Sequence, residues 1–414
     1  MNPSGMRLFY LDPGLRSDVG HHANYCRYIV GGLRARGVET LVFAEQMVNE
    51  GLQSELGARP SFRRYTYAKI HPDPIAGWLL DFMTTARITH EDLRQLPVTS
   101  TSDVVYASSV RPAQLMALLA WRNTLAQDRR PTVIVESFRT GMKVTHSKDG
   151  IKAAVPNPQI DPLATLYRYV ANWLPVESDA RFYVVTFDSI LSKGFNLLLN
   201  YPIQTLPLPY PAIIPLRNRA GARPVVVAIL GHHQAIKGYG SLPEIVEELL
   251  RTCPDMRLLL QLVDPVGPPE IQVRLREMAA NDDRVVLDER PAGKTLWSQL
   301  LEMADLILCP HRGEFYQNVG FSAVMAEALA NGIPVVVPGD TPLERLMAEY
   351  GGPGTTFDRF SPAAIAAATR QALDQFDDIG SLAHAAALSW PEKHGPARMV
   401  GELLSLIGAG RMDA

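Results

Sequence analysis

A single carboxylate, Glu327, lies in an otherwise small and apolar run, GFSAVMAEALANGIPVVVPG, at residues 320–339. We expect a helix from near Gly320 to Asn331, with Gly332 ending it as a C-cap glycine. The helix would have an apolar face and a face of small residues around the acid: Phe321, Val324, Met325, Ala328 and Leu329 on the first, and Gly320, Ala323, Glu327 and Ala330 on the second. A buried carboxylate needs donors. The hydroxyls of a ribose and the guanidinium of an arginine would both serve.

Two glycine-rich turns each follow the first expected strand of one half of the chain. They are DPGLRSDVGHHANY at residues 12–25 and ILGHHQAIKGYGSLPE at residues 229–244. Glycines let the backbone approach an oxyanion, free amides at a helix start donate to it, and Lys237 adds charge. The pattern predicts a phosphate-bearing ligand, with the amides around residues 318–321 facing the same phosphates. A sharp connection with a solvated lysine fits the second turn equally well.

Both turns contain Gly-His-His, at residues 20–22 and 231–233. Four imidazoles would gather if the two halves faced each other, which raises the question of a metal site. We expect no metal, because adjacent histidine side chains diverge and no third ligand is evident. One or two of these histidines would instead bond a phosphate or a sugar hydroxyl, or else they cap helices at the surface.

Short runs rich in Val, Ile and Leu alternate with segments of helical spacing in both halves. Such runs are typical of parallel strands buried on both faces, and they are MRLFYLDP, TLVFAEQ, DVVYASS, TVIVESF and RFYVVTFD, then PVVVAILG, MRLLLQLVD, RVVLDE, DLILCP and PVVVPGD. The repetition predicts two doubly wound α/β domains. If their strand ends faced each other, they would line a cleft. The proline-dense segment 202–224 predicts the boundary, which we place between residues 210 and 211.

The composition excludes several classes of protein. A net charge of −3 over 414 residues gives no basic field for nucleic acid. Three scattered cysteines indicate a reducing compartment, and no apolar run approaches the ~20 residues of a membrane span. We therefore expect a cytoplasmic protein. Residues 61–70 and 73–88 combine arginines, aromatics and apolar bulk, which fits either a buried helix with a polar edge or, less well, peripheral membrane contact.

Residues 225–340 resemble family 4 of the retaining GT-B glycosyltransferases. GFSAVMAEALANGIPVVVPG is similar to the donor-site signature of that family, in which a Gly-Phe loop leads to Glu-Ala-x-Ala-x-Gly-x-Pro-Val-Val. ILGHHQAIKGYGSLPEIVEEL resembles its Gly-Arg to Glu-Lys-Gly segment, and LEMADLILCP the strand before the signature. The first half matches in plan only. The resemblance implies two Rossmann-like domains, 1–210 for the acceptor and 211–388 for the donor, with a helix in 389–414 crossing back.

The resemblance also implies roles for particular residues. Glu327 falls on the second glutamate of a paired motif that holds the donor ribose, and Lys237 on the lysine that neutralises the diphosphate. The loop amides of Asn318, Gly320 and Phe321 would meet the phosphates and the sugar. Lysine, arginine and helix amides stabilise the leaving diphosphate in such enzymes, so the resemblance implies no metal. From the two turns we add Gly20, His21, Gly231 and His232 as candidate nucleotide-binding residues.

Three positions depart from the family pattern. Val319 stands where the first glutamate is expected, and Glu314 in the same loop is its candidate substitute. His232 stands where the phosphate-binding arginine is expected, so charge on the diphosphate depends on protonation. Arg139 lies near the position of the usual catalytic histidine of the first domain. Arg139 or Arg16 would be able to supply the missing positive charge.

Two functions remain open at this point. The first is a retaining, metal-independent hexosyltransferase that moves a sugar from a UDP- or GDP-linked donor to a glycan, lipid-linked or small-molecule acceptor in glycan biosynthesis. Lys237, Glu327 and Arg139 are then its candidate catalytic residues. The second is a catalytically silent relative that binds a nucleotide or glycan as a partner subunit. The same departures from the family pattern are what such a relative would have.

Overall fold

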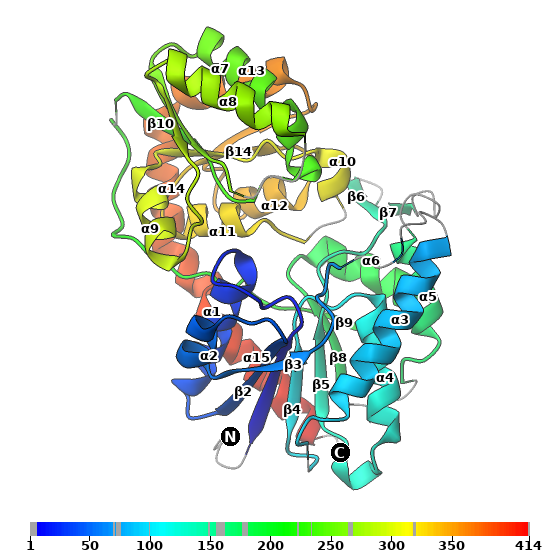
Figure 1. Cartoon of the computed structure of the whole chain (residues 1–414). Coiled ribbons are helices and arrows are strands. Elements are labelled where there is room, and N and C mark those ends of the chain that lie inside the picture. Colours follow the sequence, from blue (N-terminus) through cyan, green and yellow to red (C-terminus); the bar gives the residue numbers. More distant parts are fainter. Residues whose placement is uncertain are drawn as a thin grey trace. The chain divides into compact units, whose positions relative to one another are not determined.

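The computed structural model divides the chain into two compact units. Unit 1 is Met1–Pro209 with Pro396–Ala414, and unit 2 is Tyr210–Gly395. The residues that the structure describes are 6–68, 71, 76–98, 100–147, 150–154, 162–175, 181–221, 223–232, 234–263, 268–317 and 320–412. Figure 1 shows their elements.

Unit 1 is built on a seven-stranded sheet whose paired strands are all parallel, in the order β3-β2-β1-β4-β5-β8-β9. Its strands are β1 (Arg7–Asp12), β2 (Glu39–Glu45), β3 (Ala58–Phe62), β4 (Val104–Ala107), β5 (Thr132–Glu136), β8 (Phe182–Thr186) and β9 (Ile203–Thr205). The central strands β4 and β5 are buried at every position, as expected for parallel strands covered on both faces. An antiparallel hairpin, β6 (Lys143–Ser147) and β7 (Gly150–Ala154), stands apart from the sheet.

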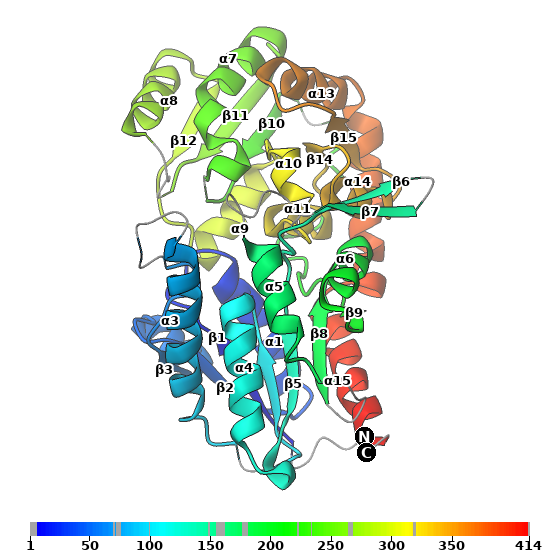
Figure 2. The same cartoon turned by 90° about the vertical axis from the view of Figure 1, so that its right-hand side faces the viewer.

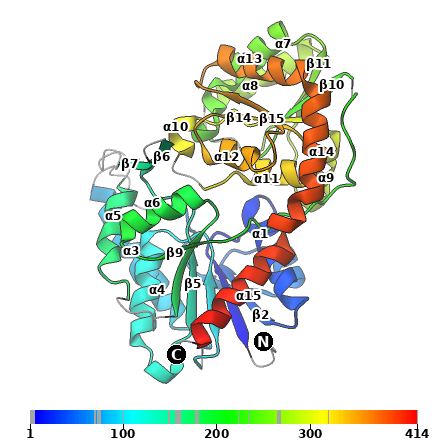
Figure 3. The ribbon, with the colours of Figure 1, turned by 180° about the vertical axis from the view of Figure 1, so that it is seen from behind.

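Helices cover both faces of this sheet. One face carries α1 (His21–Arg34), α2 (Glu50–Leu56) and α15 (Pro396–Met412), and the other carries α3 (Ala76–Leu93), α4 (Pro112–Thr124), α5 (Leu163–Ala171) and α6 (Ser189–Leu199), as Figures 1 and 2 show. Gly32 of α1 lets α15 approach, since a Cβ there would lie 2.9 Å from a methyl of Val400. Figure 3 shows α15 beside α1.

Unit 2 has a six-stranded sheet, also parallel throughout, in the order β12-β11-β10-β13-β14-β15. The strands are β10 (Val225–Ile229), β11 (Met256–Gln261), β12 (Val285–Asp288), β13 (Leu306–Leu308), β14 (Val335–Pro338) and β15 (Gly354–Phe357). One face carries α7 (Leu242–Thr252), α8 (Pro269–Asn281) and α13 (Pro362–Asp374), and the other α9 (Lys294–Met303), α11 (Ala323–Ala330) and α12 (Pro342–Ala348). The short α10 (Gly313–Tyr316) follows β13, and α14 (Phe376–Lys393) packs on α11.

The prediction of two parallel α/β sheets is confirmed. Each sheet reverses its strand order beside the first strand of its unit, between β1 and β4 in unit 1 and between β10 and β13 in unit 2. Ligands of open parallel sheets bind at such switch points, outside the carboxyl ends of the strands. The two switch points are therefore where the functional residues are sought.

Candidate functional site

The turn that carries Lys237 packs directly on the end of β13. Gly238 has φ +80°, and a Cβ there would lie 2.2 Å from the carbonyl oxygen of Pro310. Only glycine allows this approach and this backbone conformation. The amide of Arg312 also donates to the carbonyl of Ile236 at 3.0 Å. The turn after β10 and the loop after β13, which flank the unit 2 switch point, are therefore in direct contact.

The ammonium of Lys237 lies at this switch point, next to the start of α11. Its Nζ is 3.9 Å from the position of a Cβ on Gly231, and a methyl of Val324, in the first turn of α11, is 3.1 Å from the same position. The Gly231 amide donates to Gln261 at 2.9 Å, which fixes the turn. The ammonium and a first-turn residue of α11 therefore border the same glycine, which is an arrangement that suits a phosphate.

The surroundings of Lys237 disfavour its charged form. The side chain is partly exposed, but the protein around the ammonium desolvates it and lowers its pKa. Burial raises the pKa of its neighbour Cys309 to about 12, so that thiol is neutral at pH 7. Within the described part of the chain no carboxylate forms an ion pair with Lys237. An anionic ligand would supply the missing charge.

Glu327 is buried on α11, as predicted, with 3% of its surface exposed. The indole Nε1 of Trp297, on α9, donates to its Oε2 at 2.8 Å. The two donors considered from the sequence were a ribose and an arginine, and the indole is a third that was missed. The helix begins at Ala323, later than the expected start near Gly320, and it is buried from Val324 to Ala330. Gly332 just beyond it has φ +66°, as expected.

His311 is a candidate residue that the sequence analysis missed. It is buried at the carboxyl end of β13, where Nε2 lies 3.4 Å from the hydroxyl of Ser322, the N-cap residue of α11. Its ring stacks on Tyr316 at 4.3 Å. The sequence held a signal for it, because His311 is the first residue of the loop that leaves the expected strand DLILCP.

The loop expected after β13 contains a helical turn, α10, and this changes the position of Glu314. Its side chain is 54% exposed, and Oε1 lies 3.2 Å from Nε of Arg312. Of the other predicted residues nearby, Gly320 is buried and the ring of Phe321 lies 6.0 Å from that of Tyr210. His232 is partly exposed. Asn318, Val319 and His233 lie outside the described residues.

The unit 1 switch point holds a buried acid–histidine pair. Nδ1 of His22 lies 2.9 Å from Asp12 Oδ2, and Nε2 lies 3.1 Å from the hydroxyl of Tyr67. A Cβ on Gly14 would overlap the His22 ring at 2.2 Å, so the turn needs glycine to hold this histidine. Helix α1 begins at His21 as predicted, but the expected divergence of the histidines is wrong, since the rings of His21 and His22 lie 4.2 Å apart.

A second buried carboxyl, Glu136, lies at the end of β5. The hydroxyls of Tyr106 and Ser108 donate to its Oε2 at 2.8 and 3.2 Å, and the Tyr25 hydroxyl lies 3.1 Å from that of Tyr106. Burial raises the pKa of Glu136 to about 7. The group therefore changes charge near neutral pH, and nothing in its sequence surroundings singled it out.

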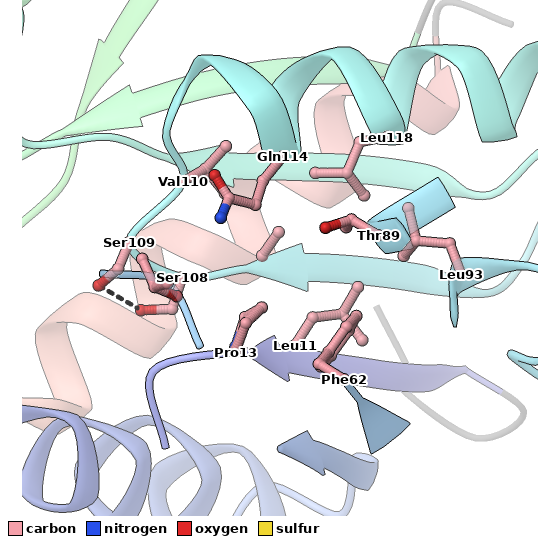
Figure 4. Close-up of a pocket in the computed structure, with 12 residues that line it drawn as sticks. Leu11, Pro13, Phe62, Thr89, Leu93, Ser108, Ser109, Val110, Gln114 and Leu118 are labelled. Carbon is pink, nitrogen blue, oxygen red and sulfur yellow. Dashed lines mark hydrogen bonds between the residues drawn. The ribbon is translucent and has the colours of Figure 1, made fainter. Parts of the chain in front are cut away.

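A small pocket lies between the ends of β1 and β4 and helices α3 and α4. Figure 4 shows the carboxamide of Gln114 and the hydroxyl of Thr89 pointing into it, among apolar side chains. Ser108 and Ser109 lie at one side, 3.5 Å apart between hydroxyl oxygens. Ser109 has φ +56°, a conformation that is uncommon for non-glycine residues. The pocket therefore marks the unit 1 switch point as a second candidate site.

The other predicted cations are in unit 1. Arg16 pairs with Glu45 at 3.1 Å and lies over the ring of Tyr65, so its charge already has an internal partner. Arg139 is partly buried after β5, where its charge acts on Tyr167.

Helix α3 is buried along one side, with Phe82 and Leu93 against the unit, and it exposes the polar pair Arg87 and Glu91 in its second half. The exposed edge of its first half is apolar, with Leu79, Leu80 and Met83 all about half exposed. Among the residues described, no helix has the length and apolarity to span a membrane. Nor do three or more potential metal-binding side chains gather anywhere in that part of the chain.

No family model matches the sequence, and no curated protein matches it. Solved structures do match. Sucrose-phosphate synthase from Thermosynechococcus elongatus has a TM-score of 0.63 and 13% identity, covering 98% of this chain and 99% of its own. Anabaena Alr3699/HepE in complex with UDP and glucose has a TM-score of 0.63 and 14% identity, covering 98% and 100%. An E. coli structure described as trehalose-6-phosphate bound with UDP-2-fluoro glucose has a TM-score of 0.61 and 14% identity, covering 97% and 98%.

At these identities the likeness concerns the fold alone. It extends over nearly the whole of this chain and of each matched structure. It agrees with the two parallel sheets, their switch points and the helices on both of their faces. The chain therefore has the GT-B fold.

Proposed function

We propose that the protein is a retaining glycosyltransferase that transfers a hexosyl group from a nucleoside diphosphate sugar without a metal ion. The observation that carries this proposal is the position of Lys237, a desolvated ammonium beside Gly231 and the first turn of α11. Three of the matched structures are of a protein in complex with UDP, UDP and glucose, or UDP-glucose. We therefore propose UDP as the first donor nucleotide to test, with GDP second.

On the donor side, Lys237 and the amides at the start of α11 would neutralise the leaving diphosphate. Charge develops on that group as the bond from the sugar to the diphosphate breaks, so preorganised donors lower the barrier. Glu327 would accept hydrogen bonds from the ribose hydroxyls, held in orientation by Trp297. Gly320 and Phe321, with Asn318 and Val319 beyond the described residues, belong to the same proposed donor loop.

On the acceptor side, we assign the unit 1 switch point. The fixed His22, the pocket beside β4 and Arg139 would position a hydroxyl of a glycan, lipid-linked or small-molecule acceptor. We place the protein in the cytoplasm. Where the acceptor is lipid-linked, the exposed apolar edge of α3 would provide peripheral membrane contact.

The test has two stages. Isothermal titration with UDP, GDP and ADP measures donor-nucleotide binding, and proton NMR of the matching sugar nucleotide then follows hydrolysis and the anomeric form of the released sugar. We expect binding, slow hydrolysis and release of the sugar with its configuration retained. Binding without turnover, with any acceptor, would favour the catalytically silent relative, and inversion would contradict the retaining mechanism alone.

A further inference from the structure

One lysine is a small counter-charge for a diphosphate, which carries more than one negative charge. His232, where the family resemblance implies an arginine, adds a charge only when it is protonated. A second permanent cation from elsewhere in unit 2 would remove this deficit.

Arg312 is placed to be that cation. It lies on the opposite side of the unit 2 switch point from the β10 turn, a few residues beyond β13, and its amide donates to Ile236 at 3.0 Å. Ile236 is the residue before Lys237. The backbone of Arg312 is therefore fastened to the very turn that carries the first cation.

Phe360 holds the side chain of Arg312 over that turn. The guanidinium carbon lies 4.8 Å from the centroid of the Phe360 ring. The edge of the same ring reaches to within 3.0 Å of the Cβ position of Gly238. A guanidinium stacked on an aromatic ring keeps its charge and its outward-facing donors while losing little freedom on binding.

Glu314, the carboxylate that lies beside Arg312, is a weak partner that an anionic ligand would displace. Oε1 of Glu314 lies 3.2 Å from Nε of Arg312, and the two side chains are 54% and 41% exposed. Exposed pairs of this kind contribute little net stability. Nε itself is buried and makes no hydrogen bond of acceptable geometry with any residue in the described part of the chain.

We propose that Arg312 is the second cation of the diphosphate site, and that Glu314 holds it when no ligand is bound. This assignment rests on the proposed function. It gives Glu314 a role different from the sugar contact expected from the sequence. A bound diphosphate would replace a weak, solvent-exposed partner with a doubly anionic one, in line with the pairing of guanidinium and phosphate.

The experiment compares three variants in the full chain by isothermal titration with UDP, inorganic diphosphate and uridine. Arg312→Gln should lower the affinities for UDP and inorganic diphosphate about 10-fold or more, which corresponds to the loss of a charge-assisted hydrogen bond. Its affinity for uridine should not change. Arg312→Lys should retain part of the affinity. Glu314→Gln should raise the affinities for UDP and inorganic diphosphate, by about threefold if the exposed ion pair contributes ~0.6 kcal/mol.

The opposite effects of the two substitutions on diphosphate affinity separate a ligand-binding role of the pair from a structural one. If the pair only stabilised the loop, Arg312→Gln and Glu314→Gln would shift the melting temperature together and leave the diphosphates unaffected. Arg370→Gln and Asp374→Asn, which remove an exposed ion pair on α13, are matched controls. Unchanged diphosphate affinity in Arg312→Gln would overturn this assignment alone. Failure of the unchanged chain to bind any nucleoside diphosphate would overturn the proposed function and this assignment with it.

Discussion

The indole of Trp297 donates a hydrogen bond of 2.8 Å to the carboxylate of Glu327, 30 residues further along the chain. The bond joins α9 to α11 inside unit 2 and fixes one oxygen of the acid that is proposed to bind the ribose. A hydrogen bond to a charged group contributes about 1.5–3 kcal/mol, more than a bond between neutral groups. Trp297 is therefore a positioning residue for Glu327.

Replacing Trp297 by Phe keeps an aromatic ring and removes the donor. We expect the affinities for uridine and UDP to fall together, by about 10-fold, because the carboxylate loses its orientation. Inorganic diphosphate, which lacks the ribose, should bind as before. Calorimetric titration with the three ligands measures the difference.

Trp390→Phe is the matched control for this variant. Trp390 is another buried tryptophan of unit 2, and its indole donates to the backbone carbonyl of Tyr210 at 2.7 Å. Trp390→Phe should lower the melting temperature without a selective loss of affinity for uridine. An equal loss of uridine affinity in both variants would mean that Trp297 acts only through stability.

Gly238→Ala tests the contact between the Lys237 turn and β13. The added methyl would meet the Pro310 carbonyl at 2.2 Å, and φ of +80° adds backbone strain. We expect unfolding to become easier by more than ~1 kcal/mol, together with weaker diphosphate binding. Thermal unfolding and titration with inorganic diphosphate would measure the two effects.

Gly352→Ala separates strain from collision. Gly352 has φ +77°, but a Cβ there would meet nothing within 4 Å. Its substitution should cost only the strain and leave diphosphate binding intact. If the two alanine variants behave alike, the close approach of Gly238 to Pro310 has no importance for the site.

Glu136 makes the stability of unit 1 depend on pH. Its folded pKa of about 7 lies above the unfolded value of 4.5, so folding favours the protonated form. Its contribution is most favourable below pH 4.5, decreases as the pH rises to 7, and is constant above that, with a total loss of about 3 kcal/mol.

Denaturant unfolding of the wild type and Glu136→Gln between pH 4.5 and pH 8 tests this effect. The amide cannot ionise, so the variant should gain stability relative to the wild type as the pH rises. A constant difference between the two proteins over this range would show that Glu136 does not change its protonation on folding.

The sequence predicted the sheets because central parallel strands are covered on both faces and are therefore continuous apolar runs. The strands that it missed, β3, β9 and β15, lie at sheet edges and have sequences such as ARPSF, IQT and GTTF. An edge strand pairs on one side only, so polar residues and Pro60 are tolerated there. The hairpin of β6 and β7 lacks the same apolar signal.

For the candidate site, the sequence identified residues whose type and local spacing are unusual. Glu327 was isolated in an apolar helix, and Lys237 followed a strand among glycines. The roles of Trp297 and Glu136 arise from contacts between segments far apart in the chain. Local sequence patterns carry no information about such contacts. The ion pair between Arg16 and Glu45, which lies on another strand, is a further contact that the local sequence does not reveal.

Lys237 is proposed to neutralise the diphosphate of a bound nucleotide. The most direct measurement is the affinity for UDP, GDP and ADP, by isothermal titration, of the unchanged chain and of Lys237→Ala. We expect one binding site per chain and a loss of about 1.5–3 kcal/mol of binding free energy in the variant, with the affinity for the nucleoside unaffected. Equal nucleotide affinity in both proteins, or no binding by the unchanged chain, would contradict this proposal.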